Sequence, residues 1–267
     1  MKRYVTFALM FMALLILPGC GTETPVEESI HAEVVPTGFA TPEDAMVAYL
    51  EGLRDGDLGR MTGAFAIEAY IANHDYEAMI ERLGVYMFNS DPRIPNANEL
   101  VTALNVENRR GQITMGIIMQ YMSLAYPEFD ALVPHPMSEE EGGAAAFTRR
   151  LNDNLNSLDL SSLEILGFIP PGSLSDLYDT EQNQENLARR ADIAGADQIT
   201  GSAAVFVLDG KQYLLLTDLV QYGEHWYLYG LGGHIGALLG LSVETQGIAP
   251  AAFVAELDLP SMMVPVE

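Results

Sequence analysis

Residues 202–231 read SAAVFVLDGKQYLLLTDLVQYGEHWYLYGL, and this stretch decides the fold. Val, Leu, Phe and Tyr, which favour strands, lie on both sides of Asp209-Gly210, a pair preferred in tight hairpin turns. Tyr222-Gly223 marks a second turn. We therefore expect Val205 and Leu214 on paired strands. The pattern predicts an antiparallel meander with the strands 202–208, 212–222 and 224–231.

Helix signals precede this meander in the first part of the chain. Thr41 is a good N-cap residue, Pro42 fits the first helical position, and two acidic residues follow it. Asp57 is placed to cap a second helix that runs to about residue 65, and 75–83 predicts another short helix.

The middle of the chain is apolar at helical spacing but is interrupted by prolines. The expected helices are 98–104, 112–126, a segment from 138 towards 154, and 182–188. The predicted fold class is therefore α+β. N-terminal helices pack on a C-terminal antiparallel sheet in a cone-like arrangement, with a mainly helical insertion at about 85–200.

The helix start TPEDA at 41–45, the turn DGDL at 55–58 and the strand residues Gly223, Trp226 and Tyr227 resemble a known superfamily. They are similar to the two ends of a nuclear-transport-factor-two-like domain, the group that includes the SnoaL-like proteins. The resemblance implies a curved sheet that wraps a helix and leaves a pocket at the mouth of a cone. Members include isomerases, dehydratases and proteins without activity, so fold membership does not transfer a function.

The N-terminus carries an export signal. A basic start at Lys2 and Arg3 precedes the apolar run 5–17, which as a helix of about 20 Å is too short to cross a bilayer core of about 30 Å. Leu17-Pro18-Gly19-Cys20 follows and resembles the lipobox of bacterial lipoproteins, with Pro18 where Ser, Ala or Thr is usual. We expect Cys20, the single cysteine of the chain, to be the lipidation site. The alternatives are an ordinary secretory signal with an incidental cysteine, or an uncleaved anchor.

The expected organisation follows from this signal. Residues 1–19 are a lipoprotein signal peptide, 20–40 an acidic flexible tether, and 41–267 a single α+β domain. A lone cysteine forms no intramolecular disulfide, so the domain must fold without one. The expected location is the extracytoplasmic face of the cell membrane, held through the lipid on Cys20.

The chain is strongly acidic. It has 37 Asp and Glu against 13 Lys and Arg, a net charge of −24. Such a chain is repelled by phosphate backbones, so we expect no nucleic-acid partner. Three arginine pairs begin at Arg109, Arg149 and Arg189, but their flanking residues share nothing. Their regular spacing is therefore interpreted as chance rather than as a repeat.

No stretch of the sequence satisfies a catalytic or metal-binding motif. Residues 230–236 approach a dinucleotide loop, but the third glycine comes one position late and a meander strand precedes it. Residues 152–163 approach a calcium loop but lack its glycine and its final glutamate. The remaining catalytic candidates are Asp218, His225 and Tyr227, an acid–base set on neighbouring strands. The alternative is that they are ordinary strand residues.

These observations predict a membrane-tethered lipoprotein whose domain binds an unidentified small molecule or envelope protein, without catalysis, cofactor or metal. The alternative is a cell-envelope enzyme with acid–base residues in the cone pocket. A solute-binding lipoprotein of a transporter is disfavoured, because the chain lacks recurring βα alternation. A pocket lined by a paired acid and base would favour the enzyme, and a filled cone the binding module.

Overall fold

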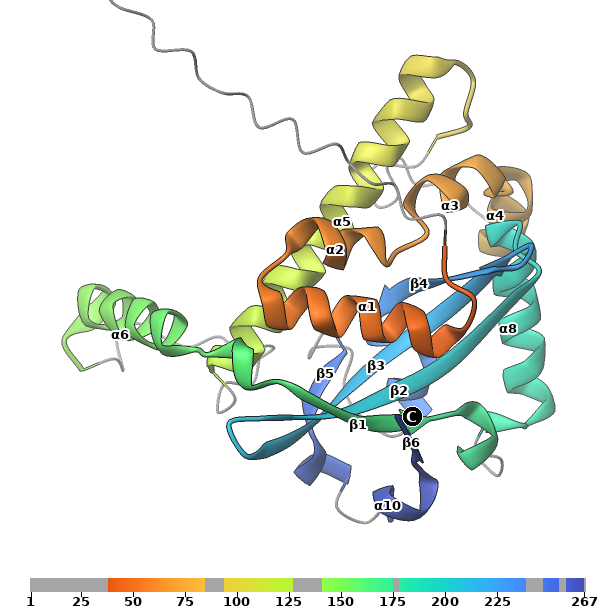
Figure 1. Ribbon diagram of the computed structural model, residues 1–267. Coiled ribbons are helices and arrows are strands. Elements are labelled where there is room, and N and C mark those ends of the chain that lie inside the picture. Colours follow the sequence, from red (N-terminus) through yellow and green to blue (C-terminus); the bar gives the residue numbers. More distant parts are fainter. Residues whose placement is uncertain are drawn as a thin grey trace, which may run out of the picture. The chain divides into compact units, whose positions relative to one another are not determined.

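An antiparallel sheet organises the protein, whose computed structural model describes residues 38–84, 94–126, 141–174, 178–238, 247–254 and 258–266. All of these belong to one unit of the chain, 34–267. Within them, six strands form a sheet in the order β4-β3-β2-β1-β6, and β5 also pairs with β3 (Figure 1). The strands are β1 (Glu164–Ile169), β2 (Gln198–Leu208), β3 (Lys211–Tyr222), β4 (His225–Leu231), β5 (Ile248–Pro250) and β6 (Val264–Pro265).

The predicted meander is confirmed. Strands β2 and β3 pair along their whole length, with Val205 opposite Leu214 as expected. Asp209 and Gly210 close the hairpin with φ values of 49° and 72°, the positive angles that a two-residue turn of this kind requires. Strand β4 follows β3 after a short turn, and a bulge lies between Asp218, which pairs with Gly230, and Leu219, which pairs with Leu228.

The described residues also form helices and short 3₁₀ turns. The helices are α1 (Pro42–Asp55), α2 (Leu58–Gly63), α3 (Ile67–Asn73), α4 (Tyr76–Leu83), α5 (Glu99–Ala125), α6 (Gly143–Ser157), α8 (Glu181–Ala194), α9 (Gly233–Leu238) and α10 (Leu259–Met262). Short 3₁₀ turns are η1 (Leu160–Ser162), η2 (Pro171–Leu174) and η4 (Ala251–Val254). The predicted caps are confirmed: Thr41 and Asp44 form a capping box on α1, and Asp57 caps α2.

The two faces of the sheet bury separate apolar clusters. One face packs against α1, which lies across the strands in Figure 1. This cluster includes Tyr49, Leu50 and Leu53 of α1 together with Phe206, Leu219 and Leu228 of the sheet. The opposite face includes Tyr70, Leu187 and Ile235 of α3, α8 and α9 together with Val205, Leu214 and Val220. Burial of each Val, Leu, Ile or Phe side chain in these clusters stabilises the folded state by about 1.5–3 kcal/mol.

The middle of the chain is mainly helical, as predicted, with two differences. The segments 98–104 and 112–126 are parts of one continuous helix, α5, which runs from its cap at Asn98 through Gly111. The middle also contains strand β1, which the expectation of a helical insertion at 85–200 missed. A six-residue apolar run does not distinguish a strand from a buried helix segment, and β1 is defined by its pairing with β2.

Candidate functional site

Of the three catalytic candidates, Asp218 lies on β3, and His225 and Tyr227 lie on the adjacent strand β4. Asp218 pairs with Gly230, His225 with Tyr222, and Tyr227 with Val220. Tyr227 packs on the apolar cluster that contains Leu216 and Val220 of β3. These two residues lie two positions before and two positions after Asp218, so they point to the same face of the sheet as Asp218 does. Asp218 and Tyr227 therefore share a face of the sheet, the one opposite α1. Within the described residues, however, no hydrogen bond joins Asp218 to either of the other two.

Asp218 is a buried carboxylate whose two oxygens are both engaged. Its side chain is 4% exposed and forms an ion pair through Oδ2 with Arg190 of α8. Its Oδ1 accepts a hydrogen bond of 2.7 Å from the backbone N–H of His234. Burial lowers the pKa of the Arg190 guanidinium, but Asp218, followed by Tyr229 and Tyr178, raises it, and the net shift of this pKa is upward. The arrangement holds α8 and the start of α9 against β3.

His225 and Tyr227 lie near the turn that begins β4. His225 is exposed, and Tyr227 is half-buried, with its ring centroid 6.4 Å from that of Tyr222. Burial, followed by the nearby Glu68 carboxylate, raises the pKa of Tyr227. The Tyr222 hydroxyl donates to the carbonyl of Ala194 at 2.9 Å. His225 and Tyr227 are two residues apart on β4 and so lie on one face of the strand, but within the described residues no hydrogen bond joins them.

Two arginines that sequence reasoning did not select converge on Tyr229. The Cζ atoms of Arg109 on α5 and Arg190 on α8 each lie 5.4 Å from the centroid of the Tyr229 ring. Arg109 also lies 4.8 Å from the Tyr70 ring and donates to the backbone carbonyl of Tyr229. The rings of Tyr70 and Tyr229 meet edge to face at 5.5 Å. We call Tyr70, Arg109, Arg190, Asp218 and Tyr229 the arginine cluster.

The space between α1 and the sheet is filled. Tyr49, Phe65, Phe206, Leu219 and Leu228 are each no more than 3% exposed. The Tyr49 hydroxyl donates to Oε1 of Gln120 on α5 in this interior, and burial raises the pKa of Tyr49 far above its ordinary value. In the described part of the chain, the position where the resemblance implies a pocket therefore holds an apolar core with one buried polar pair.

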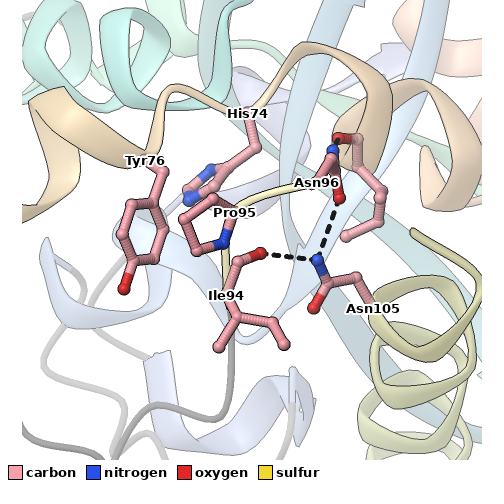
Figure 2. A pocket seen from close by; sticks show the side chains of 7 residues that line it. His74, Tyr76, Ile94, Pro95, Asn96 and Asn105 are labelled. Carbon is pink, nitrogen blue, oxygen red and sulfur yellow. Dashed lines mark hydrogen bonds between the residues drawn. The ribbon is translucent and has the colours of Figure 1, made fainter. Parts of the chain in front are cut away.

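A small cavity lies beside α3 and the start of α5 (Figure 2). Its volume is about 20 Å³, enough for about one water molecule. Asn105 donates to the carbonyl of Ile94 at 2.7 Å and to Oδ1 of Asn96 at 2.9 Å, and Asn96 donates to the carbonyl of Ile71 at 2.6 Å. Its polar wall groups mainly bind one another, so the cavity suits a structural water rather than an organic ligand. It is lined by Ile71, His74, Tyr76, Ile94, Pro95, Asn96 and Asn105.

The remaining predictions concern the lipidation site and metal binding. Cys20 lies outside the described residues. Among the residues that are described, no three His, Cys, Asp or Glu side chains come together as metal ligands, and no helix combines the length and apolar character needed to span a membrane.

Comparison with known proteins gives one weak structural similarity. No protein-family model matches the chain, and no curated protein sequence is similar to it. A cystatin-like protein from Ruminococcus gnavus shares 15% sequence identity over 70% of this chain, with a TM-score of 0.41. The matched region spans 39% of that other chain.

Proposed function

We propose that this protein is a lipid-anchored, extracytoplasmic binding module that captures a ligand or partner without transforming it. The observation that carries the non-catalytic part is the state of Asp218. A general base needs a lone pair within reach of the proton that it removes. Each oxygen of Asp218 already accepts a hydrogen bond, one from Arg190 and the other from the His234 N–H, and the side chain is 4% exposed, so a substrate has little access to its remaining lone pairs.

The filled interior supports the same proposal. An enzyme of the cone type needs a concave, partly closed site that holds its reactive groups around the substrate. The side chains between α1 and the sheet are packed and almost fully buried. Binding in this protein is therefore assigned to its outer surfaces and not to the interior of a cone.

The proposal includes membership of the nuclear-transport-factor-two-like superfamily. Its support is the sequence resemblance of 41–66 and 200–232, together with a first helix that packs on a C-terminal meander. Function is not carried over from that superfamily, because its members differ in activity.

The anchor in this proposal rests on sequence. Lys2 and Arg3, the apolar run 5–17 and Leu17-Pro18-Gly19 lead to the single cysteine, Cys20. Two acyl chains on this residue give stable attachment, whereas one chain is marginal. The acidic segment after Cys20 would then link the anchor to the domain, in which Phe39 already pairs with Trp226 of β4.

Metabolite profiling tests the absence of catalysis. The wild-type chain and the Asp218→Asn, His225→Ala and Tyr227→Phe variants are incubated with an extract of envelope metabolites, which is then analysed by mass spectrometry over time. We expect the same profile in every sample, including a sample without protein. Loss of a metabolite that scales with wild-type concentration, and that a folded variant abolishes, would contradict the proposal and favour an envelope enzyme.

A further inference from the structure

The arginine cluster concentrates positive charge in a strongly negative protein. The Cζ atoms of Arg109 and Arg190 each lie 5.4 Å from the centroid of the Tyr229 ring, so the two Cζ atoms are at most twice that distance apart. Asp218 balances Arg190. No carboxylate of the described residues forms an ion pair with Arg109, in a chain whose net charge is −24. The cluster therefore keeps an excess of one positive charge.

Arg109 also has hydrogen-bonding capacity that the protein does not use. A guanidinium group carries five N–H donors. One nitrogen of Arg109 donates to the carbonyl of Tyr229, and its Nε is buried without an acceptor. An unsatisfied buried donor costs about 1–3 kcal/mol. The terminal N–H groups of Arg109 that do not bind Tyr229 can serve a ligand that supplies an acceptor and a negative charge.

The cluster is reachable from solvent and has aromatic walls. The Arg190 side chain is 23% exposed, and Arg109, Tyr227 and Tyr229 are half-buried. The Tyr70 ring supports the guanidinium of Arg109 from the protein side. Such a site presents charged donors next to flat apolar surface, which suits a small molecule with an acidic group and a hydrocarbon body.

We propose that Arg109 and Arg190, placed around Tyr229, bind the carboxylate of a small organic acid. This proposal names the ligand class of the binding module and rests on that proposed function. A planar carboxylate matches the forked donors of a guanidinium, and the carboxylate of Asp218 already accepts one hydrogen bond from Arg190. Glu68 lies near Tyr227 but pairs with Arg110, and acidic residues farther away repel the ligand little, because exposed charges are screened beyond about 8 Å at physiological salt.

Calorimetric titration of the full chain with glutarate tests this proposal. Glutaramide, which has the same carbon skeleton without charge, is the control ligand, and ionic strength is held constant with NaCl. We expect saturable binding of glutarate and none of glutaramide. Arg109→Gln and Arg190→Gln should each weaken glutarate binding at least tenfold, since a charge-assisted hydrogen bond is lost.

The neighbouring arginines provide matched control variants. Arg110 pairs with Glu68 at 3.0 Å and Arg189 with Glu185 at 2.8 Å, so Arg110→Gln and Arg189→Gln should leave the affinity unchanged. Asp218→Asn removes the carboxylate that competes for Arg190 and should strengthen glutarate binding. A cluster with a purely structural role would change only the unfolding temperature in these variants, so circular dichroism is recorded for each.

Three results would overturn the proposal. They are no saturable binding of glutarate to the folded wild type, equal weakening by the cluster and control variants, and binding of inorganic phosphate without binding of glutarate. If Arg109→Gln fails to fold, Arg190→Gln and the wild-type titration still decide the question. Turnover of a metabolite would contradict the non-catalytic function and leave glutarate binding intact, so the two failures are distinguishable.

Discussion

The buried hydroxyl of Tyr49 makes the stability of the domain depend on pH in the alkaline range. Burial raises its pKa above the ordinary value of 10.0, so the folded protein holds this proton more tightly than the unfolded chain does. The stabilisation is fully present below pH 10 and is lost as the pH rises above it, because the unfolded chain then binds fewer protons. Tyr222, whose pKa burial also raises, adds to the same alkaline loss.

We predict that Tyr49→Phe reduces this alkaline loss. Each such tyrosine contributes a slope of at most about 1.4 kcal/mol per pH unit in the free energy of unfolding. Near neutral pH the variant should be less stable by about 0.5–1.5 kcal/mol, since one buried hydrogen bond is removed. Urea unfolding between neutral pH and pH 11 measures both effects. An alkaline slope equal to that of the wild type would refute the role of Tyr49.

The residues of the arginine cluster show where sequence reasoning stops. The sequence indicates Asp218 as a candidate because acid–base residues are recognisable by type and it lies on a predicted strand. In the sequence, Arg109 and Arg190 stand out only as members of evenly spaced arginine pairs. Nothing local distinguishes Arg109 from Arg110, which face different partners on the same helix. Only the docking of α5 and α8 against β4 brings Arg109 and Arg190 to one ring.

At the level of elements, the junction between β4 and α9 depends on Gly233. Its φ is +49°, and a Cβ atom there would lie 2.6 Å from Oδ1 of Asp218. The same oxygen accepts the hydrogen bond from His234. A side chain at this position would therefore strain the backbone and separate α9 from β3.

We predict that Gly233→Ala destabilises the protein more than Gly210→Ala does. Gly210 also has a positive φ, of +72°, but no atom lies within 4 Å of the added Cβ. Its substitution should cost only the left-handed strain of about 1–2 kcal/mol. Gly233→Ala should cost at least about 1 kcal/mol more, through the lost hydrogen bond to the buried carboxylate. Chemical unfolding compares the two variants, and equal losses would contradict this account of the junction.

Elements defined by nearby residues were predictable, and those defined by distant partners were not. The β2–β3 hairpin is specified by Asp209-Gly210 and its flanking strands, and α1 by its capping box. Strands β1, β5 and β6 are short, and their sequences carry no alternation that identifies them. They become strands because β2, β3 and β1, respectively, offer edges to pair with.

At the level of the whole molecule, we propose an acidic α+β domain that is anchored to a membrane. We infer binding rather than catalysis from the filled interior and the engaged Asp218, and we propose the arginine cluster as the place of an anionic ligand. In our proposal, the lipid on Cys20 places this ligand-binding domain at a membrane.

Labelling with a fatty-acid analogue, combined with membrane fractionation of bacteria that produce the full chain, tests the central claim most directly. The wild type should incorporate the analogue and sediment with membranes. Cys20→Ser should lose both properties and appear in the soluble fraction, while Thr24→Ala, a change in the tether that keeps the thiol, should behave as the wild type. Unchanged labelling and membrane association of Cys20→Ser would contradict the account of a lipid-anchored binding module.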